Sequence, residues 1–369
     1  MGPLWSAAAA NVDSPHAMGI HMAAKVEAAR SQVAKLIGCA SQEIVFTSGA
    51  TEANNIALLG IAKSAMSKGE SRKRVVVSAM EHKSILAVCE ELARMGFEVL
   101  TLPAGNDGVI DLSEAGRLVT ANTLLVSTML VNNETGMVQP VKEIAALARE
   151  VGAVIHTDAA QAAGRVPVDV FALDVDLASV SGHKMYGPGG VGALFVSATS
   201  PLRPMPITFG GGQEGGLRPG TLPGPLICGF GEAAVLASER MASDQSHSQA
   251  LAKGLLDGLR QCQVRFSEIG DPSARVPGSL CLAFEGVRAD DLINAVSPHV
   301  CISSGSACSS GQITASHVLA AINIPPSEID NIIRIYCGRY NSMHEINYAA
   351  AAIAEAALRL AGPTGRVRQ

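Results

Sequence analysis

One lysine directly follows a short apolar run in DLASVSGHK, where Ser181 and His183 stand close to Lys184. Lysine side chains mostly lie on the solvated surface, so a lysine in an exposed turn is the ordinary interpretation of such a position. Here small residues and a histidine surround the amine immediately after a segment with strand character. A lysine amine in that setting can attack a carbonyl group. Lys184 is therefore a candidate catalytic residue, provided that other segments supply its partners.

Three more segments place polar residues behind strand-like runs. IHTDAAQ contains Asp158 and Gln161, EHKS contains His82, and TSGATEAN contains Ala50 and Thr51. Together with the lysine, these are the parts of a pyridoxal phosphate (PLP) site. A lysine forms a Schiff base with the cofactor, and a carboxylate keeps the pyridinium nitrogen protonated so that the ring accepts electrons. Backbone N–H groups at a helix N-terminus suit the phosphate, and an imidazole can lie on the ring.

A cysteine of a different kind occurs in SSGSACSSG, at position 308. Free cysteine is among the residues most often buried, yet the glycine, alanine and serine around Cys308 predict a mobile, accessible loop. Only a thiolate is a nucleophile, and a thiol on such a loop can approach a site and leave it again. The alternative is an exposed cysteine in a linker without a function. The motifs described above make this alternative less favoured.

A scaffold of alternating strands and helices is predicted to position these residues. Strands are predicted for EIVFTSG, RVVVSAM, FEVLTLP, TLLVSTMLV, AVIHTDA, DLASVSG and GALFV, and helices for residues 25–36, 52–65 and 84–95 and for VKEIAALAREVG. Short apolar strands between helices indicate a mostly parallel sheet covered on both faces. Ligands bind beyond the carboxyl ends of such strands, where the candidate residues stand. After a long helix at 226–259, VPGSLCLAFEG, IIRIYCGRY and a helix at 349–360 predict a smaller α+β unit.

Composition excludes several classes of function. The 369 residues suggest two domains, and a net charge of −5 gives no reason to expect nucleic acid or an anionic membrane as a partner. No run approaches the roughly 18 apolar residues of a membrane span, and the opening residues lack the positive region of a signal peptide. The eight cysteines contain no C-x-x-C pair, so free thiols in a reducing cytoplasm are expected rather than a disulfide framework or a metal site.

The chain resembles the cysteine desulfurases of the NifS/IscS type over nearly its whole length. These belong to the class V aminotransferase group of fold-type I PLP enzymes. The matching segments are EIVFTSGATEANN, EHKSIL, VNNETGMVQP, HTDAAQAAGRVPVDV, SGHKMYGPGGVGAL, GGGQEGGLRPGT and SSGSACSSG. The resemblance implies an α/β fold-type I transferase: a large PLP-binding domain with a mostly parallel seven-stranded sheet at 15–235, and a small α+β domain. The small domain would comprise residues 1–14 and 236–369 and carry the cysteine loop at 301–315.

The resemblance also implies roles for single residues. The implied cofactor-binding residues are Ala50, Thr51, Asn133, Asp158, Gln161, Ser181, His183, Lys184 and Thr221. Lys184 would bond the cofactor covalently, Asp158 would hold the ring nitrogen, and Gln161 would hydrogen-bond the phenolic oxygen. Ala50, Thr51, Ser181 and His183 would bind the phosphate, and Thr221 would reach the phosphate of the neighbouring subunit in a homodimer.

For the substrate, the resemblance implies L-cysteine, with its carboxylate bound by Arg334 and with Asn133 in contact with substrate or cofactor. His82 would stack on the ring and transfer protons. Cys308 would take the sulfur atom as a persulfide and leave L-alanine, and it would also be a transient iron–sulfur ligand. An iron–sulfur scaffold or another acceptor protein would receive the sulfur.

Some features depart from the family pattern. The usual N-terminal segment, Y-L-D-N-A-A-T-T-P, has no counterpart before NVDSPH, Pro219 replaces the commoner Ser or Ala of the R-x-G-T motif, and the extended tail of the housekeeping IscS type is not evident. The last of these features favours a NifS-like or stand-alone sulfur donor. Two alternatives stay open: a selenocysteine lyase or related PLP amino-acid lyase, and a catalytically impaired PLP-binding partner protein with a shortened N-terminus.

Overall fold

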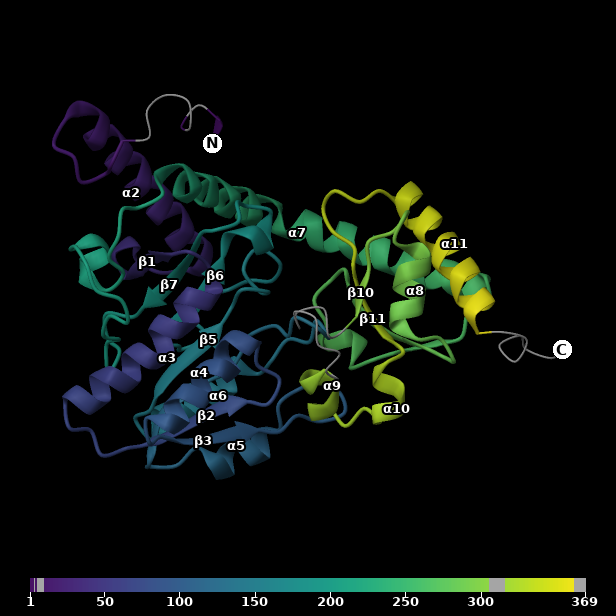
Figure 1. Cartoon of the computed structure of the whole chain (residues 1–369), viewed down its shortest axis with the longest axis horizontal. Helices are drawn as coiled ribbons and strands as arrows, with labels where there is room; N and C mark the ends of the chain where they lie inside the picture. Colours follow the sequence, from purple (N-terminus) through teal and green to yellow (C-terminus); the bar gives the residue numbers. More distant parts are fainter. Residues whose placement is uncertain (3, 5–9, 305–315, 362–369) are drawn as a thin grey trace. The chain divides into compact units, whose positions relative to one another are not determined.

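The computed structural model describes residues 1–2, 4, 10–304 and 316–361 (Figure 1). The chain divides into two compact units. The first comprises Met1–Leu102, Asp111–Val131 and Gln139–Met241, and the second comprises Pro103–Ile110, Asn132–Val138 and Ala242–Gln369. Two short stretches of the N-terminal half thus belong to the second unit. Among the described residues, none of the helices is long and apolar enough to cross a membrane.

The first unit contains a seven-stranded sheet, which confirms the predicted mostly parallel α/β architecture. Its order is β1 (Ile44–Thr47), β7 (Gly192–Val196), β6 (Leu177–Ser181), β5 (Val154–Asp158), β4 (Thr123–Ser127), β2 (Arg74–Ser78) and β3 (Glu98–Leu102). β7 runs antiparallel to both of its neighbours, and every other pair is parallel. All residues of β1, β4, β5, β6 and β7 are buried, as expected for strands covered on both faces.

Helices connect these strands. They are α2 (Ala17–Ile37), α3 (Ala50–Ser67), α4 (Lys83–Arg94), α5 (Leu112–Leu118), α6 (Val141–Glu150) and α7 (Gly224–Gln261), whose residues divide between the units. Helix α3 packs against β6, β7 and α4, and its apolar face joins the strands in one core. The first unit also contains three short 3₁₀ turns among its described residues: η1 (Ser41–Glu43), η2 (Gly182–Met185) and η3 (Gln213–Gly216).

The second unit contains a four-stranded antiparallel sheet in the order β10 (Ser303–Ser304), β11 (Ile332–Tyr336), β9 (Ser279–Phe284) and β8 (Phe266–Glu268). A 3₁₀ turn, η4 (Pro272–Ala274), precedes β9. Helices α8 (Ala289–Val296) and α11 (Met343–Leu360) pack together and against the sheet, and α9 (His317–Ala321) and α10 (Pro326–Ile329) are short (Figure 1). Sequence patterns predicted β9, β11 and α11, whereas the shorter elements carry too few residues for a clear period.

Candidate active site

The last residues of β1 and β6 lie beside the first residue of β7 in the first sheet. Gly192, the first residue of β7, pairs with Thr47 at the end of β1 on one side and with Ser181 at the end of β6 on the other. A Cβ atom at Gly192 would lie 2.7 Å from the Cα atom of Gly49, so only glycine permits the chain after β1 to pass this close. This close approach brings the start of α3 against the ends of β6 and β7.

Gly49 is the N-cap residue of α3, and its φ of 151° is a conformation that side chains rarely allow. A Cβ atom built on Gly49 would lie 3.9 Å from Ser181 Oγ, which places that hydroxyl at the helix N-terminus. Glycine has no side chain that could accept from the first amides of the helix, those of Ala50 and Thr51. The structure therefore brings these three predicted phosphate ligands together, in an arrangement that suits an anion.

Asp158 ends β5, the strand next to β6, and its side chain is buried. The Ala160 N–H group donates to Oδ1 at 2.9 Å, and the Asn54 Nδ2 group donates to Oδ2 at 2.8 Å. Asn54 lies on α3 and is fully buried. Both contacts are of the kind that an ionised carboxylate makes, so Asp158 is held in one orientation at the carboxyl end of the sheet.

His82 is the N-cap residue of α4 and is half-buried. Its Nδ1 atom accepts from the backbone N–H of Ser84 at 3.1 Å and lies 2.9 Å from Ser84 Oγ. Ser84 in turn lies 2.9 Å from Asn54 Nδ2. The predicted ring-stacking histidine and the predicted pyridinium partner, Asp158, are therefore joined through two side chains that the sequence patterns did not single out.

Glu81 is a second buried acid in this part of the first unit. It is fully buried, and its Oε1 atom accepts from Met129 N at 2.6 Å. Burial raises the pKa of Glu81 well above its usual value, and the negative charge of Asp158 adds to the rise. The only sequence signal for Glu81 was its place beside His82.

Lys184 lies in η2, directly after β6, and is half-buried. The neighbouring His183 is exposed, and its Nδ1 atom lies 2.9 Å from Ser181 Oγ. Partial desolvation, followed by the charge of Lys184, lowers the pKa of His183 below its usual value. His183 is therefore mainly neutral at pH 7 and can donate or accept a hydrogen bond beside Ser181.

Gln161 follows β5 and receives a hydrogen bond from Arg165: Arg165 Nη1 donates to Gln161 Oε1 at 2.9 Å. The oxygen of the side-chain amide is therefore engaged, and the NH₂ group is the part that remains for a ligand oxygen. This orientation agrees with the predicted contact to a phenolic oxygen, which needs a donor.

Thr221 lies beyond η3 in an exposed stretch of the first unit. Two residues that precede Thr221 are bonded to helices. Arg218 Nε donates to Glu52 of α3 at 3.0 Å, and Glu214 accepts from Arg30 Nη2 of α2 at 2.7 Å. Glu52 belongs to the first turn of α3, so this loop is tied to the same helix N-terminus as the other phosphate ligands.

In the second unit, the structure joins Arg334 and Asn133. Arg334 lies on β11, and its Nη1 group donates to the backbone carbonyl of Asn133 at 2.9 Å, while Nε donates to the carbonyl of Ser304 at 3.1 Å. The Oδ1 atom of Asn133 is buried and has no hydrogen-bond partner within the described part of the chain. Such a buried acceptor is costly unless a ligand supplies a donor.

Cys308 lies outside the described residues. The flanking residues are described, and both are held within the second unit. Ser304 accepts from Arg334, and Ser316 donates from Oγ to Glu134 Oε2 at 2.6 Å, with Ser316 and Glu134 both buried. Glu134 follows Asn133 directly, so the residues on either side of 305–315 are bonded to the predicted substrate arginine and to a neighbour of the predicted substrate asparagine. No sequence pattern singled out Glu134.

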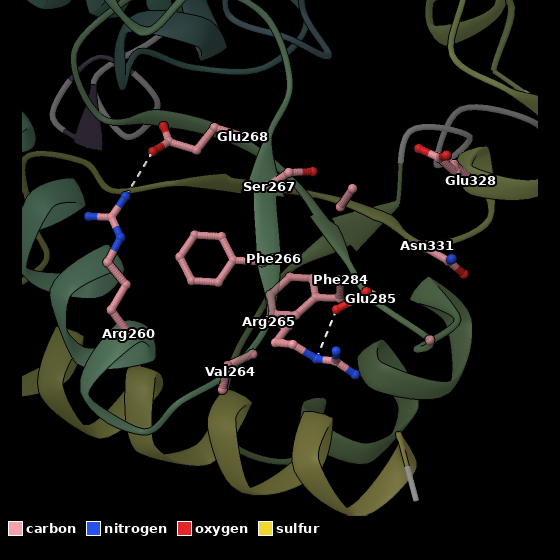
Figure 2. A pocket seen from close by; sticks show the side chains of 12 residues that line it. Arg260, Val264, Arg265, Phe266, Ser267, Glu268, Phe284, Glu285, Glu328 and Asn331 are labelled. Atoms are coloured by element: carbon pink, nitrogen blue, oxygen red, sulfur yellow. Dashed lines mark hydrogen bonds and ion pairs between the residues drawn. The ribbon is translucent and has the colours of Figure 1, made fainter. Parts of the chain in front are cut away.

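A separate groove of about 660 Å³ in the second unit contains none of the predicted site residues (Figure 2). Two ion pairs join charged side chains that line this groove: Arg260 with Glu268 at 3.2 Å, and Arg265 with Glu285 at 2.8 Å. Across the described residues, no group of three or more His, Cys, Asp or Glu side chains is arranged to hold a metal ion.

Comparison with known proteins shows the family to which the chain belongs. The family model for aminotransferase class-V matches residues 1–348. A cysteine desulfurase IscS of Rickettsia rickettsii (strain Iowa) is 44% identical over 337 residues, which are 90% of this chain and 80% of that protein. A solved NifS-like protein superposes with a TM-score of 0.88 at 32% identity, over 96% of this chain and 93% of the other. SspA, solved in complex with cysteine, superposes with a TM-score of 0.79 at 34% identity, over 92% of this chain and 94% of the other. The chain belongs to the class-V aminotransferase family and, within it, to the cysteine desulfurases of the NifS/IscS type.

Proposed function

We propose that this chain is a PLP-dependent cysteine desulfurase that converts L-cysteine to L-alanine and carries the sulfur atom on Cys308 to an iron–sulfur assembly scaffold or another acceptor. Relatives named cysteine desulfurase cover most of its length, and the first unit holds Asp158, Ser181 and Lys184 at or directly after the ends of neighbouring strands. The single observation that carries the proposal is the fixed carboxylate of Asp158 on β5, next to the strand that leads into Lys184.

The residues present fit PLP. A phosphate dianion needs several donors, and Ala50, Thr51 and Ser181 gather at one helix N-terminus. A pyridinium N–H group needs a carboxylate, which Asp158 supplies, and a phenolic oxygen needs a donor, which the amide of Gln161 supplies. PLP, when bound, supplies an electron sink for the bonds at the α-carbon of the amino acid.

The side chains of the chain then divide the work. Lys184 holds the cofactor covalently and can move a proton at its amine, as expected for a half-buried lysine that follows a strand directly. His82, held at the N-terminus of α4, is the proton-transferring group on the ring face. Asp158 keeps the ring nitrogen protonated through its negative charge. Ser181 and His183 fix the phosphate end.

We assign the substrate carboxylate to Arg334. A guanidinium group binds a carboxylate through parallel N–H bonds, and the two backbone carbonyls that Arg334 already contacts hold its plane in place. Asn133 offers the buried Oδ1 acceptor, which suits a donor on the substrate or on the cofactor.

The sulfur transfer balances without an added oxidant. The thiolate of Cys308 bonds to the sulfur atom of L-cysteine while the carbon–sulfur bond of the substrate breaks and its electron pair passes to carbon. That carbon takes up a proton, so the products are L-alanine and a persulfide on Cys308. A thiol reductant or an acceptor protein then removes the outer sulfur atom.

The remaining assignments belong to the same proposal. A homodimer would let Thr221 reach the phosphate of the partner's site. A reducing cytoplasm suits a reaction that needs a free thiol, and the cysteines of the described residues are free. Cys308 is also the residue proposed to ligate a transient iron–sulfur cluster, where the cluster is cargo.

The test is the production of alanine and sulfide from L-cysteine by the purified chain with PLP and a thiol reductant. Equal amounts of both products are expected. The Cys308→Ala variant should keep the colour of the bound cofactor and lose sulfide release. A yellow protein that makes neither product would overturn the proposal, and selenocysteine would then test the lyase alternative.

A further inference from the structure

A continuous chain of hydrogen bonds runs from Asp158 to His82 inside the first unit. Asn54 Nδ2 lies 2.8 Å from Asp158 Oδ2 and 2.9 Å from Ser84 Oγ, and Ser84 Oγ lies 2.9 Å from His82 Nδ1. The two linking residues are buried, with Asn54 fully inaccessible to solvent. Bonds of this kind in a buried region have few competing water partners and act on one another.

The direction of each bond follows from the first residue. The carboxylate of Asp158 only accepts, so Asn54 must present its NH₂ group. The second hydrogen of that group then points to Ser84 Oγ, which accepts. The hydroxyl hydrogen of Ser84 is left to donate to His82 Nδ1.

The backbone N–H of Ser84 donates to the same Nδ1 atom. Nδ1 thus receives two donors and carries no proton itself. In the neutral ring, the proton is on Nε2.

Two other helix starts within the described residues show the same pattern with a carboxylate as the acceptor. Asp111 caps α5 and accepts from the backbone and the hydroxyl of Ser113, and Asp271 caps η4 and accepts from both groups of Ser273. At α4 a ring nitrogen takes the place of the carboxylate. The capping role therefore requires Nδ1 to act as an acceptor.

We propose that Ser84 and Asn54 are positioning residues that hold His82 as the neutral Nε2–H tautomer. The catalytic meaning of this assignment rests on the proposed function, because it makes His82 a donor toward the cofactor and substrate. A proton on Nδ1 would point at the backbone N–H group of Ser84, and the hydrogen bond that caps α4 would be lost. The ring therefore enters the reaction as a hydrogen-bond and proton donor through Nε2, and it can accept a proton there only after it has released one.

The tautomer can be measured directly by NMR of the full chain labelled with ¹⁵N-histidine, with and without PLP. The His82→Gln variant assigns the signals of His82. The expected wild-type spectrum shows an unprotonated Nδ1 and a protonated Nε2. In Ser84→Ala, loss of one neutral hydrogen bond should raise the population of the other ring forms about fivefold.

Ser113→Ala is the matched control, because it removes the same hydroxyl from the cap of α5 and should leave the His82 signals unchanged. Ser84→Thr keeps the hydroxyl and should restore the wild-type spectrum. A wild-type ring with the proton on Nδ1, or equal spectra for Ser84→Ala and wild type, would overturn the proposal.

These outcomes are separate from the proposed function. The predicted tautomer in a chain without desulfurase activity would reject the function alone, and desulfurase activity with the Nδ1–H tautomer would reject this inference alone.

Discussion

The two units hold their predicted site residues in different ways. In the first unit, Asp158 on β5 accepts from the backbone N–H of Ala160 and from the side chain of Asn54 on α3, and all three residues are buried. In the second unit, Arg334 donates to two backbone carbonyls, and its own side chain is half-buried on a strand next to the two-residue β10. The first arrangement includes a bond between two buried side chains, whereas both of these bonds of Arg334 go to main-chain carbonyls.

This difference indicates a division of tasks. A cofactor that stays bound is best served by groups that do not move, because pre-organised dipoles need no rearrangement during a reaction. A group that receives and releases a substrate must exchange partners, and an arginine with several N–H groups can do so while some of its bonds persist. Damage to the first unit should therefore impair cofactor binding, and damage to the second unit should impair substrate binding.

The largest effect is expected from Lys184→Ala. Removal of the amine eliminates the covalent attachment of the cofactor, so the yellow colour should disappear and desulfurase activity should fall at least about a thousandfold. Absorbance spectra and alanine production measure the two effects. Lys83→Ala, which removes an exposed lysine at the start of α4, is the control and should behave as the wild type. A Lys184→Ala protein that stays yellow after dialysis would remove this lysine from its assigned role.

Acid should destabilise the first unit through His156. This residue is fully buried in β5 between Ser127 and Ser179, and burial lowers its pKa from 6.5 to about 3. Between these values the unfolded chain binds a proton and the folded chain does not. The free energy of unfolding should therefore fall as pH falls, by about 1.4 kcal/mol per pH unit from this group. Urea unfolding from pH 7 to pH 4 measures the slope, and in His156→Gln that contribution should vanish. An unchanged slope in the variant would assign the acid sensitivity to other groups.

The sequence patterns predicted the strands of the first sheet, and they placed candidate site residues behind those strands. Asp158, Lys184 and His82 were predicted because each follows an apolar run, and the order of such runs along a chain determines which ends share an edge of a parallel sheet. The residues that connect them were not predicted. Asn54 appears in sequence as one polar residue within a helix, and Ser84 as an ordinary first-turn serine; only the packing of α3 against α4 and β5 shows that both are buried partners of the site.

Glu134 was missed for a related reason. Its partner Ser316 lies far along the chain, and no local period or motif relates an acid after β4 to the cap of a short helix. Hydrogen bonds between distant segments depend on the tertiary fold and leave no mark on local spacing. The roles that depend on Cys308 and on a second copy of the chain, that of Thr221 among them, remain predictions.

A smaller effect on activity is expected from Arg334→Ala. Loss of a charged hydrogen-bond donor to the substrate carboxylate should weaken binding by about 2 kcal/mol, which raises KM about thirtyfold. Arg334→Lys keeps the charge and loses the planar fork, so it should recover only part of the affinity. Steady-state kinetics with L-cysteine give both values, and the colour of the bound cofactor should be unchanged in both variants. An unaltered KM in Arg334→Ala would place the carboxylate elsewhere.

The smallest effect is expected from Ser316→Ala, compared with Ser342→Ala. Both serines cap helices of the second unit, α9 and α11, and loss of a cap costs about 1 kcal/mol. Ser316 also donates to buried Glu134, whereas Ser342 is exposed and bonded to exposed Glu345. The buried carboxylate loses a donor in one variant only, so Ser316→Ala should lower the free energy of unfolding by about 1 kcal/mol more than Ser342→Ala, as measured by urea unfolding. Adding Glu134→Gln to Ser316→Ala removes the buried charge and should recover part of that difference. Equal losses in the two serine variants would mean that the Glu134 contact adds nothing to the stability that the cap provides.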